Sequence, residues 1–88
     1  MQYSYSLEKD KILRETRGFG FENIISAIGN GNLVAIEKHS NNEKYSHQNI
    51  LYVRMSDGIY TVPSVINGEE IFFKTAYRSR VATKRFNS

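Results

Sequence analysis

The fold of this chain is decided between residues 50 and 76, which read ILYVRMSDGIYTVPSVINGEEIFFKTA. Two pairs in this stretch, Asp57-Gly58 and Asn67-Gly68, are strong signals for tight two-residue hairpin turns. The segments beside them are rich in β-branched and aromatic residues, which favour strands. The stretch therefore predicts a meander of three antiparallel strands, over residues 50–55, 59–66 and 70–76.

Pro63 lies in the middle strand of this meander. A middle strand has neighbours on both sides, and proline has no N–H to donate to either of them. We therefore expect a bulge or a break at Pro63. Side chains alternate along a half-buried strand, so Leu51 and Val53 should lie on the face opposite Arg54. We expect the sheet face that carries Arg54 and Lys74 to be the open one.

Helical patterns precede the strands. One apolar stripe has the i, i+3, i+4, i+7 spacing of a single helix face, and it consists of Phe21, Ile24, Ile25 and Ile28. An earlier, mostly polar helix is predicted over residues 7–17, with Ser6 as its N-cap and Gly18 as its end. A short strand is expected at residues 33–38, followed by a polar loop at 39–49.

These patterns predict a single α+β domain over residues 1–88. Two N-terminal helices pack on one face of a twisted antiparallel sheet of about four strands. The chain ends in a short basic tail or helix, for which Ser79 can act as the cap. An apolar content of 40%, with six Tyr and five Phe, is enough for a core in a domain of this size.

The composition excludes several kinds of site. There are no cysteines, so disulfides and thiolate metal sites cannot form, and a reducing cytoplasm fits. His39 and His47 lie in the polar loop without a close carboxylate pattern, so we expect neither a metal ion nor a cofactor. No apolar run approaches the roughly 20 residues that span a bilayer, and no signal-peptide pattern is visible. We expect a cytoplasmic protein that does not bind membranes.

Positive charge is concentrated at the C-terminal end. The net charge is +3, yet residues 1–73 carry seven basic and nine acidic residues. Residues 74–88 contain no acidic residue, and their five basic residues are Lys74, Arg78, Arg80, Lys84 and Arg85. Tyr77, Thr83 and Phe86 lie among them. Such a mixture suits a phosphate backbone and its bases, although a basic tail can also be a solvated segment that keeps a protein soluble.

One reaction is within reach of this composition without a metal ion. RNA is cut when its 2′-OH attacks the adjacent phosphate, which needs a general base, a general acid and positive charge on the developing phosphorane. The residues assigned to phosphate stabilisation are Arg80, Arg78 and Arg54, and those assigned to proton transfer are Lys74, Tyr77 or His39. The residues assigned to RNA binding are Lys44, Tyr45, Thr83, Lys84 and Arg85. These residues alone do not separate a ribonuclease from an RNA binder, since Arg54 can also serve in a salt bridge and Tyr77 in packing.

Two short motifs resemble those of the BrnT-like toxins of bacterial type II toxin–antitoxin systems, a family related to the RelE ribonucleases. The first motif is RGFGFE at residues 17–22, which leads into the apolar helix, and the second is RVATKR at residues 80–85. The residues that match are Gly18, Phe21, Glu22, Arg80, Ala82 and Thr83.

The resemblance implies a RelE-like fold and a metal-independent endoribonuclease that cleaves mRNA and inhibits translation. It also implies a small antitoxin, encoded beside the toxin, that covers the basic surface and helps to repress the operon. Of the candidate site residues, it carries over Arg80 with its basic and hydroxyl neighbours. The alternatives are a non-catalytic RNA- or protein-binding module that uses the same tail, and a toxin-like protein that has lost catalysis. The sequence leaves open whether the ribosome takes part and whether the chain forms a homodimer.

Overall fold

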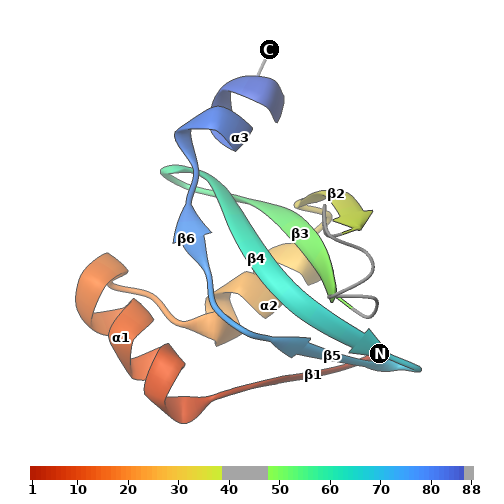
Figure 1. The fold of residues 1–88 in the computed structure, drawn as a ribbon. Helices are drawn as coiled ribbons and strands as arrows, with labels where there is room; N and C mark the ends of the chain where they lie inside the picture. Colours follow the sequence, from red (N-terminus) through yellow and green to blue (C-terminus); the bar gives the residue numbers. More distant parts are fainter. Residues whose placement is uncertain (39–47, 87–88) are drawn as a thin grey trace.

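The computed structural model describes residues 1–38 and 48–86 and places them in an α+β fold. The predicted fold class is thus confirmed. In chain order the elements are β1 (Gln2–Tyr5), α1 (Leu7–Arg17), α2 (Phe21–Gly29), β2 (Leu33–Lys38), β3 (Gln48–Met55), β4 (Gly58–Asn67), β5 (Glu70–Phe73), β6 (Tyr77–Arg78) and α3 (Arg80–Phe86). Figure 1 shows α3 apart from the other two helices, beside the turn that joins β3 to β4.

The sheet is mixed and larger than the sequence predicts. Its strands follow the order β1-β5-β4-β3-β2, and β6 pairs with β4. The four strands β2 to β5 are antiparallel neighbours, so both predicted hairpins are present. Their two-residue loops are Ser56-Asp57 and Gly68-Glu69, each one position away from the predicted pair. β1 adds a parallel edge, with Tyr3 opposite Ile71. Sequence reasoning missed β1 because it has only four residues and pairs with a strand at the other end of the chain.

Pro63 marks a break in the neighbouring strand and not in its own. β4 is continuous, and the carbonyl oxygen of Pro63 accepts a hydrogen bond from the N–H of Lys74 at 2.8 Å. The nitrogen and oxygen of one strand residue point to the same side, so the absent N–H also faces Lys74. β5 ends at Phe73 and β6 begins at Tyr77. The prediction of a bulge or break at Pro63 is therefore wrong, and the interruption lies in the neighbouring strand, between β5 and β6.

The main core lies between α2 and one face of the sheet. Its fully buried strand residues are Leu51, Val53, Tyr60, Val62 and Phe73. The Phe73 ring stacks on Tyr3 and on Phe21, with centroids 5.4 and 5.7 Å apart. Phe21 also stacks on Tyr5 at 5.1 Å. These rings join β1, β5 and α2, which are far apart in the sequence.

The opposite face of the sheet is partly covered by α3. Ile59 and Thr61 alternate with the core residues of β4 and so point the other way, yet only 0% and 5% of their surface is exposed. α3 packs on this part of β4, with Ala82 buried against it. The Ser79 hydroxyl accepts from the N–H of Ala82 at 3.0 Å, which confirms the predicted helix cap. Beyond α3 the face is open, and Lys74 is exposed as predicted.

The link between α1 and α2 is held by one carboxylate. Ser6 caps α1 and Gly18 ends it with a φ of 79°, as predicted. Asp10 accepts from the N–H of Phe21 at 2.8 Å and from Nε of Arg14 at 2.9 Å. These two bonds, the backbone one first, hold the pKa of Asp10 below its usual value. The apolar stripe of α2 is thereby oriented toward the sheet.

The aromatic stack predicts different roles for two adjacent phenylalanines. Phe73→Ala should lower the free energy of unfolding by about 3–5 kcal/mol, because it removes a fully buried ring from the centre of the core. Phe72→Ala is the matched control, since this ring is 38% exposed on the other face, and it should cost much less. Urea unfolding measures both values. Equal losses for the two variants would contradict this description of the core.

Candidate functional site

α3 brings predicted site residues together at one end of the sheet. Arg80, Lys84 and Arg85 lie on α3 itself. Arg54 comes from β3, and its Nη2 donates to the carbonyl oxygen of Phe86 at 3.2 Å. The last carbonyls of a helix lack intrahelical donors and carry partial negative charge, so this guanidinium stabilises the end of α3. Arg54 thereby joins the basic tail across 32 positions of sequence.

Two other predicted site residues fasten α3 to the turn between β3 and β4. The Thr83 hydroxyl donates to the carbonyl of Ser79 at 2.7 Å and accepts from the N–H of Ile59 at 2.9 Å. Arg78 donates from Nε to the carbonyl of Asp57 at 2.6 Å. The hydroxyl of Thr83 is therefore engaged inside the protein, while Arg78 keeps part of its guanidinium available.

Gly58 permits this close docking. Its φ of +140° disfavours any side chain. A Cβ at this position would lie 2.9 Å from both Nε of Arg78 and Oγ1 of Thr83. The glycine that signals the hairpin in the sequence thus also leaves room for the contacts that position α3.

A carboxylate meets the basic tail on the same face. Glu37 of β2 accepts two hydrogen bonds from the Arg85 guanidinium, at 3.2 Å from Nη1 and 2.5 Å from Nη2. Tyr52 of β3 lies beside them, and its ring contacts that of Phe86 with centroids 5.1 Å apart. We call Glu37, Tyr52, Arg85 and Phe86 the Glu37 cluster. The Glu37 and Arg85 side chains are 38% and 54% exposed, so a ligand can reach both.

The groups of the Glu37 cluster perturb one another. Hydrogen bonds from Arg85, and then one from Tyr52, hold the pKa of the Glu37 carboxyl below its usual value. Glu37 is therefore ionised at neutral pH. Burial raises the pKa of Tyr52, and the nearby charge of Glu37 raises it further. Tyr52 therefore keeps its proton and can donate a hydrogen bond to the carboxylate.

Tyr77 extends this arrangement along the sheet. It pairs with Thr61 of β4, which in turn pairs with Tyr52, so the two tyrosines lie on the same face on either side of Thr61. Tyr77 is 49% exposed, and Phe72 is a second exposed ring on this face. The open face thus carries two accessible aromatic rings.

Three basic side chains remain available on this side. Within the part of the chain that the structure describes, the side chains of Lys74, Arg80 and Lys84 form no hydrogen bond or ion pair, and all three residues are exposed. They can therefore bind an anion without first breaking an internal contact. The predicted site residues His39, Lys44 and Tyr45 lie outside the described residues.

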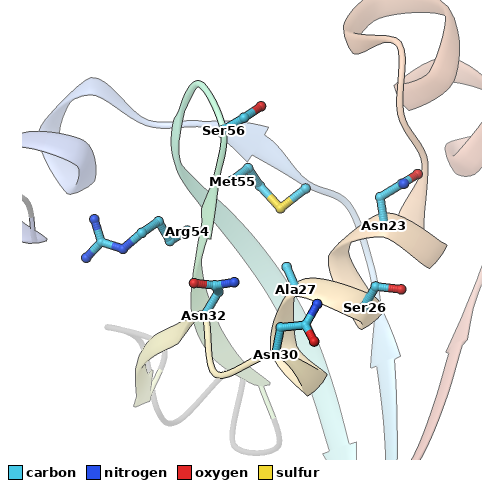
Figure 2. Close-up of a pocket in the computed structure, with 8 residues that line it drawn as sticks. All are labelled: Asn23, Ser26, Ala27, Asn30, Asn32, Arg54, Met55 and Ser56. Carbon is cyan, nitrogen blue, oxygen red and sulfur yellow. The ribbon is translucent and has the colours of Figure 1, made fainter.

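A groove on the α2 side offers different chemistry. It has a volume of about 410 Å³ and is lined mainly by amide and hydroxyl groups, among them Asn23, Asn30 and Asn32. Figure 2 shows Met55 pointing toward α2, whereas Arg54 points the opposite way. The groove therefore offers hydrogen bonds but no acid–base pair from the described residues that line it. The charged face with α3 is the better candidate site.

Comparison of the chain with protein-family models, curated proteins and solved structures found no match. No three His, Cys, Asp or Glu side chains of the described residues lie together in a way that could hold a metal ion. Among these residues there is also no helix long and apolar enough to cross a membrane.

Sequence reasoning missed Glu37 and Tyr52. Glu37 is the one acid in a short strand, and Arg85 follows 48 positions later, so no short-range spacing connects them. Tyr52 was placed correctly on the face of Arg54, but its neighbours come from β2 and α3. The only available signal was the alternation of side chains along each strand. It puts Glu37 of β2 on the same sheet face as Arg54 of β3.

Docking of α3 predicts a difference between two substitutions of Thr83. Thr83→Val has nearly the same shape but leaves the buried N–H of Ile59 without its acceptor, so it should cost about 1–3 kcal/mol of stability. Thr83→Ser keeps the hydroxyl and should cost less. Urea unfolding, with hydrogen exchange of the α3 amides, measures both effects. If the valine variant were as stable and as protected as the serine variant, this hydroxyl would not hold α3 in place.

Proposed function

We propose that the protein is a BrnT-like toxin that cleaves RNA without a metal ion, at the sheet face against which α3 packs. The observation that carries this proposal is the convergence of α3, Arg54 and the exposed aromatic rings on a single face. Cations and aromatic rings on one open surface are what single-stranded RNA requires, because they match its phosphates and its bases.

RNA binding would use basic side chains that form no hydrogen bond or ion pair with the other described residues. Lys74, Arg80 and Lys84 would neutralise phosphates and release counterions. Tyr77 and Phe72 would stack on bases, which contributes about 1–3 kcal/mol for each base in comparable sites. Lys44, Tyr45 and Arg85 complete the proposed binding residues, together with the tail around Thr83.

Cleavage would use the three arginines of the proposal. Arg80, Arg54 and Arg78 would hold the phosphate, since a guanidinium can donate two parallel hydrogen bonds to phosphate oxygens. Their charge favours the phosphorane more than the ground state, and this difference is what accelerates the reaction. Tyr77, Lys74 and His39 are the proposed proton carriers.

The proposal includes a partner and a setting. A toxin with an exposed basic face requires an antitoxin that covers it, and an acidic segment of a small protein would match this charge. The fold would be RelE-like, the substrate mRNA and the compartment the cytoplasm. A non-catalytic RNA-binding module could use the same rings and cations, so the two functions differ only in whether RNA is cut.

Induced expression in bacteria tests the proposal. The intact protein should arrest growth and shorten total mRNA, and Arg80→Ala should relieve both effects, because the loss of a phosphate-stabilising donor typically lowers a rate about 10²–10³-fold. Lys9→Ala is the matched control, since it removes an exposed cation from α1 on the other side of the sheet.

Two results would count against the proposal. Normal growth with intact mRNA, when the protein is soluble and folded, would favour the binding module. Arrest that Arg80→Ala leaves unchanged would exclude Arg80 from the site.

A further inference from the structure

The proposed ribonuclease function leaves the general base unassigned, and the Glu37 cluster contains a group suited to this role. A base for the 2′-OH must be ionised, accessible and close to the charge that stabilises the phosphorane. Glu37 meets these conditions, since its carboxylate is 38% exposed and its two oxygens contact Arg85.

A purely structural role explains the Glu37–Arg85 pair less well. Exposed ion pairs contribute little to stability, and this one requires two long side chains to be held in one geometry. The docking of α3 already has its own contacts through Thr83 and Arg78. The two hydrogen bonds of the pair also keep one carboxylate fixed on the open face.

We propose that Glu37 is the general base of RNA cleavage, with Arg85 and Tyr52 as the residues that position it. The inference rests on the proposed ribonuclease function, which does not by itself say which residue is the general base. The substrate is a single-stranded RNA whose scissile phosphate lies on the open face between Glu37 and Tyr77, over the Tyr52 ring.

The proton transfers of this reaction balance. Glu37 takes the proton of the 2′-OH while the 2′-oxygen forms a bond to phosphorus. The bond from phosphorus to the 5′-oxygen breaks, and the Tyr77 hydroxyl gives its proton to that leaving oxygen. The products are a 2′,3′-cyclic phosphate and a 5′-hydroxyl end. Glu37 then returns its proton to water and Tyr77 regains one.

The charges around Glu37 set the sign of the pH dependence. Arg85 faces it from α3 and Tyr52 from β3, and Arg85 has the larger effect in lowering its pKa. A base acts in its ionised form, so the cleavage rate should rise with pH through this lowered pKa and then level off. In Arg85→Gln the acidic limb should move to higher pH, toward the ordinary value for glutamate of about 4.3.

The first experiment measures single-turnover cleavage of a short RNA and of a uridine 3′-(4-nitrophenyl phosphate), whose leaving group needs no acid. Glu37→Gln should slow both reactions about 10²–10⁴-fold, the usual contribution of a general base. Tyr77→Phe should slow the RNA reaction but leave the nitrophenyl reaction nearly unchanged. Glu22→Gln is the matched control, because it removes a carboxylate that pairs with Arg14 at 3.9 Å between α1 and α2.

Binding separates catalysis from folding. Glu37→Gln should bind a 2′-O-methyl RNA of the same sequence as tightly as the unchanged protein does. Glu37→Asp keeps the charge and should retain intermediate activity, which guards against a folding defect in the glutamine variant.

The outcomes distinguish the inference from the function on which it rests. If the unchanged protein cleaves RNA and Glu37→Gln cleaves it equally fast, Glu37 is not the base, but the ribonuclease function stands. If the unchanged protein binds RNA without cleaving either substrate, both the role of Glu37 and the ribonuclease function are wrong. Loss of activity in Glu37→Gln together with loss of RNA binding would make Glu37 a structural residue and would also overturn the inference.

Discussion

The structure depends on the burial of β4 from both sides. Tyr60 and Val62 pack toward α2, while Ile59 and Thr61 pack toward α3, so four consecutive residues of one strand are buried. A strand in this position cannot shift its register by one residue without exchanging its two faces. The main core and the candidate site are therefore built on opposite sides of the same four residues.

This constraint explains how a basic tail becomes part of a site. A solvated tail would carry its charges at variable distances from the sheet, and their effect on a ligand would be screened by salt. Docked on β4, α3 instead holds Arg85 against Glu37 and receives Arg54 at its last turn. RNA would meet some cations that pair with no other residue in the described part of the chain, and others that are already oriented by protein groups.

The sequence predicted what short-range signals encode. Both hairpins, the caps of α1 and α3, and the apolar stripe of α2 each depend on residues within a few positions of one another. β1, β6 and the Glu37 cluster depend on tertiary pairing, so local spacing does not show them. Pro63 is an intermediate case. The sequence shows that its backbone N–H is missing, but it does not show which neighbouring strand loses a hydrogen bond as a result.

The most direct test of the account is to map where RNA binds. Amide chemical shifts of the labelled protein would be followed while a short 2′-O-methyl RNA, which cannot be cleaved by its own 2′-oxygen, is added. The largest changes should fall on α3, on β6 and on the parts of β2 and β3 around Glu37 and Tyr52. Changes centred on the groove beside α2, or none at millimolar RNA, would contradict it.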